Sequence, residues 1–270
     1  MLKDKTIGFI GGGNMAEALI KGLMAGGTAA ASIFVAEPQT GRREFIAERY
    51  GVKCYEENSA VVTGSNVVVL AVKPQVAETV LREMGKIADA GKLFISIMAG
   101  VKIATMEEAL LDGARVVRVM PNTPALVLEA ASAIAPGTKA TAEDISTARA
   151  IFELVGKAWQ VDEKLMDAVT GLSGSGPAYV LTFIEAFSDA GVKNGLSRDI
   201  ATGLAAQTVF GTAKLLLETG EHPAVLRDKV TSPGGTTIAG LHMLEKVGFR
   251  GTLINAVDAA TARSRELGQK

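Results

Sequence analysis

The first half of the chain alternates short apolar runs with segments whose apolar residues recur every three or four positions. The short runs predict β-strands, and the three- to four-residue spacing predicts helices with one buried face. The predicted strands are residues 6–10, 33–36, 66–72, 93–97, 115–119 and 131–135. The predicted helices are residues 15–25, 41–50, 75–88 and 103–111. This alternation predicts an α/β fold with a parallel, doubly wound sheet.

After about residue 140 the pattern changes, and helical spacing takes over. The helical segments are residues 142–154, 164–190, 198–218, 238–247 and 253–267, with one further strand expected at 158–161. We therefore predict two domains, an α/β domain over residues 1–162 and an all-helical domain over residues 163–270. Residues 179–187 are apolar on most sides of their helix, which requires deep burial. In so small a domain we expect burial against a second copy, and we predict a homodimer.

Composition and charge narrow the function classes. The chain has 270 residues, 48% of them hydrophobic and 21% charged, and a net charge of -1. A general nucleic-acid binder needs a basic surface, so the charge argues against that class. Cys54 is the only cysteine, so no intrachain disulfide can form, as expected in a reducing compartment. No run approaches the roughly 18 apolar residues of a membrane span. We predict a cytoplasmic protein with neither a nucleic-acid nor a membrane partner.

A glycine-rich turn follows the first predicted strand and opens the first predicted helix. It carries the pattern G-x-G-x-x-A at Gly11, Gly13 and Ala16. Gly11 allows the tight turn, Gly13 lets the backbone approach a pyrophosphate, and Ala16 permits close packing of helix on strand. Free N–H groups at the helix start favour the negative charge of the diphosphate. This setting predicts a dinucleotide-binding (Rossmann) domain. The residues predicted to bind the dinucleotide here are Gly11, Gly12, Gly13, Asn14 and Met15.

The end of the second strand bears on which nucleotide is bound. Glu37 stands where an acidic side chain accepts hydrogen bonds from the ribose hydroxyls, which favours NADH. Arg42 and Arg43 follow closely and offer charge for the 2′-phosphate of NADPH. The same arginines also fit the solvated face of the next helix. The sequence therefore leaves the choice between NADH and NADPH open.

Two further segments follow strand ends, where open parallel sheets bind ligands. The first reads Ala-Val-Lys-Pro, and its Lys73 is either catalytic or, as we prefer, lines the cofactor through its backbone. The second reads Met-Pro-Asn-Thr-Pro, and its Asn122 offers an amide to the nicotinamide ribose or the substrate. A plain rigid connection is the alternative for Asn122. The predicted cofactor residues in these segments are Ala71, Val72, Lys73, Pro74 and Asn122.

A second glycine turn lies near the end of the chain, where residues 231–238 read Thr-Ser-Pro-Gly-Gly-Thr-Thr-Ile before a helical segment. Backbone N–H groups and hydroxyls converge at such a helix start and favour a small anion. The alternative is a helix cap with a tight turn. The residues predicted to bind the substrate are Ser232, Gly234, Gly235, Thr236 and Thr237.

Other catalytic and metal sites find no support. The only histidines, His222 and His242, are interpreted as structural. The chain has no Ser/His/Asp arrangement, no zinc-type cysteine spacing and no pair of carboxylates placed for acid–base work. We therefore predict no metal site.

Taken together, these motifs resemble the pyrroline-5-carboxylate reductase family over essentially the whole chain. The similar segments are residues 9–15, 71–74, 118–124, 171–179, 218–223 and 228–241. The resemblance implies an enzyme that reduces 1-pyrroline-5-carboxylate to L-proline with NADPH or NADH, the last step of proline biosynthesis. It also implies helical domains that interlace into a dimer, and dimers joined into a larger ring such as a decamer.

The resemblance also implies roles for single residues. Ser232 and Thr237 match the substrate-contacting residues of the family, and Asn58 matches an asparagine near the adenine ribose. Glu37 departs from the pattern, because many relatives carry a small or hydroxylated residue there. An automatic assignment of NADPH is therefore not justified.

The substrate implied by the resemblance is a five-membered cyclic imine that carries one carboxylate. The amides of Gly234, Gly235 and Thr236 supply an anion site at a helix start without a buried arginine. We predict that Thr237 is catalytic, as a hydroxyl donor that polarises the imine nitrogen. The nitrogen takes its proton from solvent before binding, so no histidine is required. Much of the remaining rate is expected from holding nicotinamide and imine in near-attack geometry.

Two rival functions have sequence requirements that this chain does not meet. A 3-hydroxyacid or ketopantoate reductase relies on a lysine in its helical domain, but Lys164, Lys193 and Lys214 stand in no comparable motif. A non-catalytic nucleotide sensor with the same fold predicts a damaged substrate loop, and the segment 232–237 is intact. Both rivals are therefore disfavoured.

Overall fold

A computed structural model of the protein describes residues 2, 4–87 and 91–268. The chain forms two compact units, the first comprising Met1–Ser175 with Ala259–Lys270 and the second comprising Gly176–Asp258. The first unit thus extends past residue 162 and takes in the last helical turns of the chain. The domain boundary predicted between residues 162 and 163 stays a prediction. The predicted end of the helix at residue 88 and the outermost residues of both predicted domains lie outside the described residues.

The first unit is built on one sheet, which has eight strands in the described part of the chain. Their order across the sheet is β3 (Lys53–Tyr55), β2 (Ile33–Ala36), β1 (Ile7–Ile10), β4 (Val67–Leu70), β5 (Leu93–Ser96), β6 (Arg115–Met120), β7 (Ala130–Pro136) and β8 (Gly156–Gln160). Neighbouring strands are parallel except for β6 and β7, which pair antiparallel with Val119 opposite Ile134. The predicted α/β class with a doubly wound, mainly parallel sheet is confirmed, and the β6–β7 pair is its one antiparallel pair among the described strands. Only a short 3₁₀ segment, Thr123–Val127, joins β6 to β7, and a parallel crossover needs a dozen residues or more.

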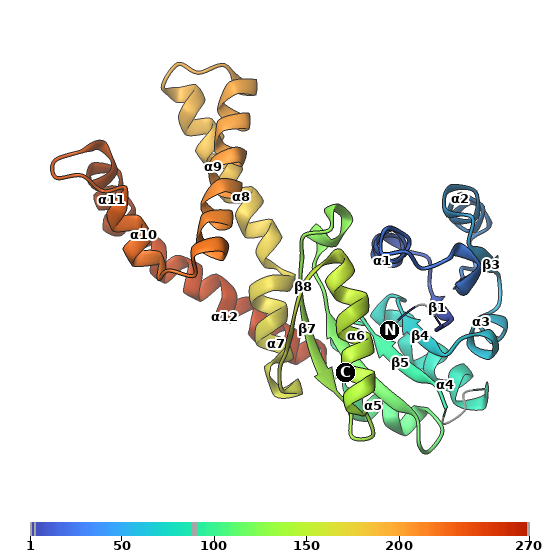
Figure 1. Ribbon diagram of the computed structural model, residues 1–270. Coiled ribbons are helices and arrows are strands. Elements are labelled where there is room, and N and C mark those ends of the chain that lie inside the picture. Colours follow the sequence, from blue (N-terminus) through green and yellow to red (C-terminus); the bar gives the residue numbers. More distant parts are fainter. Residues whose placement is uncertain (1, 3, 88–90, 269–270) are drawn as a thin grey trace. The chain divides into compact units, whose positions relative to one another are not determined.

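Helices cover both faces of this sheet (Figure 1). Residues of α1 (Asn14–Ala25), α2 (Thr40–Tyr50) and α6 (Ala142–Phe152) share one buried cluster with alternate strand residues. Residues of α3 (Asn58–Gly64), α4 (Ala77–Ile87) and α5 (Ile103–Ala109) share the other. Val67 and Val69 of β4 belong to the first cluster, and Val68 and Leu70 belong to the second. Because both faces are covered, the central strands are continuous apolar runs, as their sequence predicted.

Two short elements of the first unit were not predicted from the sequence pattern. Lys53–Tyr55 is a strand of three residues at the edge of the sheet, and Asn58–Gly64 is a helix of seven. Neither is long enough to display a clear period of two or of three to four residues.

The helical segment expected over residues 164–190 is interrupted, because the chain changes its winding three times before α8. A 3₁₀ turn at Glu163–Leu165 and a short α7 at Met166–Val169 lead into a π-helical turn, η6, at Thr170–Gly174. The Ser175 N–H donates to the Thr170 carbonyl at 2.8 Å, the five-residue span of a π turn. The glycine-rich sequence from 171 to 176 favours this change, since glycine holds regular helix poorly.

The second unit consists of helices. They are α8 (Gly176–Lys193), α9 (Arg198–Thr219), α10 (Pro223–Lys229), α11 (Thr236–Lys246) and the first half of α12 (Phe249–Leu267). Helices α8 and α9 lie side by side as a hairpin (Figure 1). They approach closely at Gly191, where an added Cβ would lie 2.9 Å from the Cβ of Ala201.

Much of this unit's apolar surface is exposed within the described chain. Exposed large apolar side chains occur on α8, α9, α11 and α12, among them Phe187, Leu204, Phe210, Met243 and Ile254. By length and composition only, α9 is the one helix of the described residues that could cross a membrane, with a mean hydropathy of 1.3 over an 18-residue window. A single helix of this kind is weak evidence for a span. The sequence-based expectation overlooked it because polar residues interrupt the apolar run.

Candidate active site

The glycine turn between β1 and α1 has the geometry of a diphosphate-binding loop. Gly11 has a φ of 97°, and a Cβ added there would lie 2.8 Å from the Ala71 carbonyl oxygen. A side chain at this position would therefore be strained and would collide with the segment after β4. An added Cβ at Gly13 would meet nothing within 4 Å, so this side of the loop is open. Gly13 caps α1 without a side-chain hydrogen bond, which leaves the helix start available to an anion.

The Gly12 peptide is held from both sides by charged side chains. The Glu37 carboxylate accepts the Gly12 N–H through Oε2 at 2.9 Å, and the Arg42 Nε donates to the Gly12 carbonyl at 2.6 Å. Glu37 is 9% exposed, and its Oε1 also accepts the Gln39 N–H at 2.9 Å. The structure therefore brings the glycine loop and Glu37 together, as the dinucleotide-binding motif predicts.

Arg42 is tied in turn to a carboxylate on α1 that the sequence analysis missed. Its Nη2 donates to Glu17 Oε2 at 2.6 Å, and the Tyr50 hydroxyl donates to Glu17 Oε1 at 2.8 Å. Burial acts to raise the pKa of Glu17, but the bonds from Arg42 and Tyr50, with the charges of Arg42 and Arg49, bring it below its ordinary value. Burial and the bond to Glu17 raise the pKa of Tyr50. The place of Glu17 in the first turn of a helix was the available signal, since acids are favoured there.

The segments after β4 and β6 are held by their own hydrogen bonds. The Ala71 N–H donates to the Ile10 carbonyl at 2.8 Å, and Pro74 begins the next 3₁₀ turn after an exposed Lys73. Asn122 accepts the Ala131 N–H through Oδ1 at 2.9 Å and donates from Nδ2 to the Ser173 carbonyl at 3.1 Å. The amide of Asn122 thus connects the loop after β6, the start of β7 and the π turn. Its proposed contact with a ligand stays a prediction.

Asn58 lies at the first position of α3, and its amide donates to Glu83 Oε2 of α4 at 2.8 Å. This bond joins two helices on one face of the sheet. Its expected place near an adenine ribose also stays a prediction.

The predicted substrate loop lies in the second unit and forms the start of α11. Gly234 has a φ of 68°, and the Gly235 N–H donates to the Ser232 carbonyl at 3.1 Å. Gly235 caps the helix without a side-chain bond, and a Cβ added there would lie 2.3 Å from Ser232 Oγ. The glycines are therefore required by the turn itself, and they leave the N–H groups at the start of α11 without a capping side chain. Thr237 is half-buried in the first turn.

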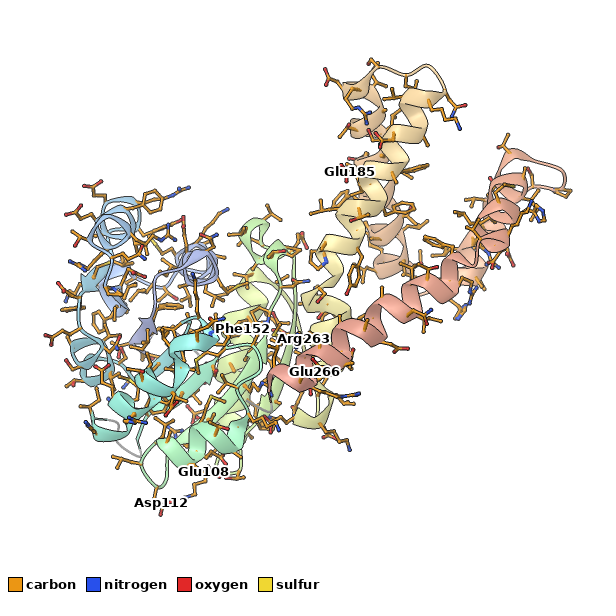
Figure 2. All side chains as sticks on the ribbon, turned by 180° about the vertical axis from the view of Figure 1, so that it is seen from behind. Glu108, Asp112, Phe152, Glu185, Arg263 and Glu266 are labelled. Carbon is orange, nitrogen blue, oxygen red and sulfur yellow. The ribbon has the colours of Figure 1, made fainter. Side chains whose placement is uncertain are left out.

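A cavity of about 1100 Å³ lies within the first unit, lined by α4, the loop after β5 and the end of α12. Of the residues predicted to bind the cofactor, only Pro74 lines it, beside Ala99 and Gly100. Arg263 of α12 also lines it and pairs with Glu266 at 2.6 Å (Figure 2). No sequence motif pointed to this cavity, because its walls come from four segments that lie far apart in the sequence.

Within the described ranges, no group of three or more His, Cys, Asp or Glu side chains is placed to hold a metal ion. His222 caps α10 by accepting the Ala224 N–H at 3.2 Å, which agrees with its structural interpretation.

Comparisons with known proteins agree with a chain made of an N-terminal α/β part and a C-terminal helical part. Residues 163–267 match the family model of pyrroline-5-carboxylate reductase dimerisation, and residues 6–100 match that of the coenzyme F420-dependent NADP oxidoreductases. The pyrroline-5-carboxylate reductase of Methanosarcina acetivorans is 49% identical over 100% of both chains.

Solved structures are similar over nearly the same length. The pyrroline-5-carboxylate reductase of Coxiella burnetii is 36% identical with a TM-score of 0.93, over 97% of this chain and 98% of that one. The pyrroline carboxylate reductase of Plasmodium falciparum, solved with NADP bound, is 34% identical with a TM-score of 0.88, over 98% and 99%.

Proposed function

The chain belongs to the pyrroline-5-carboxylate reductase family, and we propose that it reduces 1-pyrroline-5-carboxylate to L-proline with NADPH or NADH. The proposal depends on the similarity of this chain, over its full length, to a pyrroline-5-carboxylate reductase. The glycine turn that opens α11 is present in this chain. A cyclic imine with one carboxylate needs an anion site and a polar contact for its nitrogen. The start of α11 offers both.

The dinucleotide is assigned to the glycine loop of the first unit. The proposed ligands are the open helix start at Gly13, Asn14 and Met15, with Glu37 at the end of β2. The strand-end segments 71–74 and Asn122, together with Asn58, complete the set. When bound, the reduced nicotinamide supplies the hydride. The loop holds the dinucleotide in a fixed position, because hydrogen bonds to Glu37 and Arg42 fix the Gly12 peptide on both sides.

The substrate carboxylate is assigned to the N–H groups of Gly234, Gly235 and Thr236. They lie at the start of an 11-residue helix, where the dipole favours an anion. Ser232 is placed across the same turn, and its Oγ lies beside Gly235. The Thr237 hydroxyl is assigned to the imine nitrogen, which is protonated when it binds, so the hydroxyl oxygen accepts a hydrogen bond from that N–H. The proton on that nitrogen comes from solvent, so Thr237 orients the imine without transferring a proton of its own.

The assembly is proposed to be a homodimer formed through the helical unit, with dimers joined into a larger ring such as a decamer. The support is the dimerisation match over residues 163–267 and the exposed apolar side chains of α8, α9, α11 and α12. We also propose a cytoplasmic protein without nucleic-acid or membrane partners, on the grounds of the near-neutral charge and the absence of any disulfide pair in the sequence.

Steady-state reduction of 1-pyrroline-5-carboxylate by the purified full chain tests this function. The wild type should form L-proline with at least one nucleotide, and Thr237→Ala should lower turnover by about 10- to 100-fold, as expected for one lost hydrogen bond in the transition state. Cofactor affinity should change little, because the contact is to the imine alone.

Thr252→Ala is the matched control, since that hydroxyl donates to the Gly248 carbonyl just before the start of α12. This variant should keep wild-type turnover. No reduction of the imine by the wild type would refute the function. Equal losses of turnover and cofactor affinity in Thr237→Ala would refute the role of the threonine.

A further inference from the structure

The carboxylate of Glu37 has a fixed orientation at the end of β2. Each of its oxygens accepts one backbone N–H, from Gly12 and from Gln39. A carboxylate offers about four acceptor positions, so two remain for a ligand. The side chain is nearly buried, and its negative charge is screened little by solvent.

The two arginines that follow β2 are already occupied by partners within the same unit. Arg42 donates to the Gly12 carbonyl and to Glu17, and its guanidinium lies 5.1 Å from the centre of the Phe45 ring. Its side chain is 23% exposed. The carboxylate of Glu17 thus balances the charge of Arg42.

Arg43 is directed at main-chain carbonyls. Its Nη1 donates to the carbonyls of Glu37 at 2.7 Å and Pro38 at 3.2 Å. Its Nη2 lies 3.5 Å from Glu56. A 2′-phosphate could use either guanidinium only if existing hydrogen bonds were broken, whereas the acceptors of Glu37 need no rearrangement to receive hydroxyl donors.

We propose that this chain selects NADH over NADPH and that Glu37 is the residue that determines the choice. The inference rests on the proposed function only in taking a nicotinamide dinucleotide as the reductant. In this class of fold an acidic side chain at the end of the second strand accepts hydrogen bonds from the adenosine ribose hydroxyls. A 2′-phosphate removes that donor and places an anion beside a buried carboxylate. Loss of a hydrogen bond to a charged group corresponds to about 10- to 100-fold in affinity.

Calorimetric titration of the full chain with NADH and with NADPH, in the absence of substrate, tests the inference directly. NADH should bind about 10- to 100-fold more tightly. Equal affinities, or tighter binding of NADPH, would overturn it. Since no turnover is measured, the result is separate from the proposed function. A protein that selects NADH but does not reduce the imine refutes the function alone, and a reductase that binds NADPH more tightly refutes the inference alone.

Two variants locate the determinant. Glu37→Ser removes the carboxylate and should bring the ratio of the two affinities close to one or reverse it. Glu48→Gln removes an exposed carboxylate of α2 and should keep the wild-type ratio. Circular dichroism checks that each variant is folded. If Glu37→Ser does not fold, Glu37→Gln keeps the side-chain length and one acceptor oxygen, and the ratio should shift in the same direction. A folded Glu37 variant with the wild-type ratio would exclude Glu37 as the determinant.

Discussion

Glu17 shows how a single carboxylate supports the glycine loop between β1 and α1. It accepts hydrogen bonds from Arg42 and Tyr50, and Arg42 in turn holds the Gly12 carbonyl. Although burial opposes ionisation, these partners lower the pKa of Glu17 below its ordinary value of 4.5. A carboxylate with a lowered pKa stabilises the fold above its unfolded-state pKa. This contribution is lost as the pH falls from about 4.5 through the lowered folded-state pKa.

We therefore expect Glu17→Gln to lower the free energy of unfolding by about 1–3 kcal/mol at pH 7, the usual size for hydrogen bonds to a charged group. The difference from the wild type should shrink as the pH falls from about 4.5 towards 3, because protonation of the wild-type carboxylate progressively removes the charge there as well. Urea unfolding at fixed protein concentration measures both values. Glu78→Gln, which removes an exposed partner of Arg82, should change stability little at either pH. A destabilisation by Glu17→Gln that is the same at pH 7 and pH 3 would contradict the role of the charge.

At the scale of helices and strands, the apolar pattern succeeded where a strand is mostly buried or a helix is long. The buried runs at 33–36 and 93–97 and the helix over 198–218 were predicted within a residue or so of their observed bounds. The direction of β7 was not predictable from its apolar pattern, because a strand reads the same in either orientation. It was the shortness of the link from β6 that decided it. The π turn at 170–174 contains glycines and accepts a hydrogen bond from Asn122. Neither feature changes the spacing of apolar residues, so the sequence pattern could not predict the turn.

Helix α9 carries a stripe of exposed apolar side chains on one side, at Ile200, Leu204 and Leu215. Their spacing of 4 and 11 residues puts them on one face of the helix. We expect this face to pack against a second copy, so Leu204→Asp should shift the sedimentation profile from oligomer to monomer. Leu111→Asp is the matched control, because Leu111 is 45% exposed against 56% for Leu204 but lies in the first unit. An unchanged oligomer in Leu204→Asp would exclude this face from the interface.

At the scale of the whole chain, the sequence predicted the class of fold from its apolar pattern. It also predicted the two glycine turns, because each is a local pattern of glycines next to a regular element, and the binding roles of these turns stay predictions. The sequence did not predict the hydrogen-bond partners of the residues around these turns. Glu17 reaches Arg42 across 25 positions, and Asn122 reaches Ser173 across 51, and neither spacing is a motif. The nucleotide preference stayed open for the same reason, since the partners of Arg42 and Arg43 are visible only in three dimensions.

The central claim is that backbone amides and one hydroxyl at the start of α11 hold a negatively charged cyclic imine. A crystal structure of the full chain with L-proline, the product, tests it most directly. The proline carboxylate should lie within hydrogen-bond distance of the N–H groups of residues 234–236, and the ring nitrogen should lie beside the Thr237 hydroxyl. Ordered proline bound elsewhere in the protein, with nothing at residues 232–237, would contradict it.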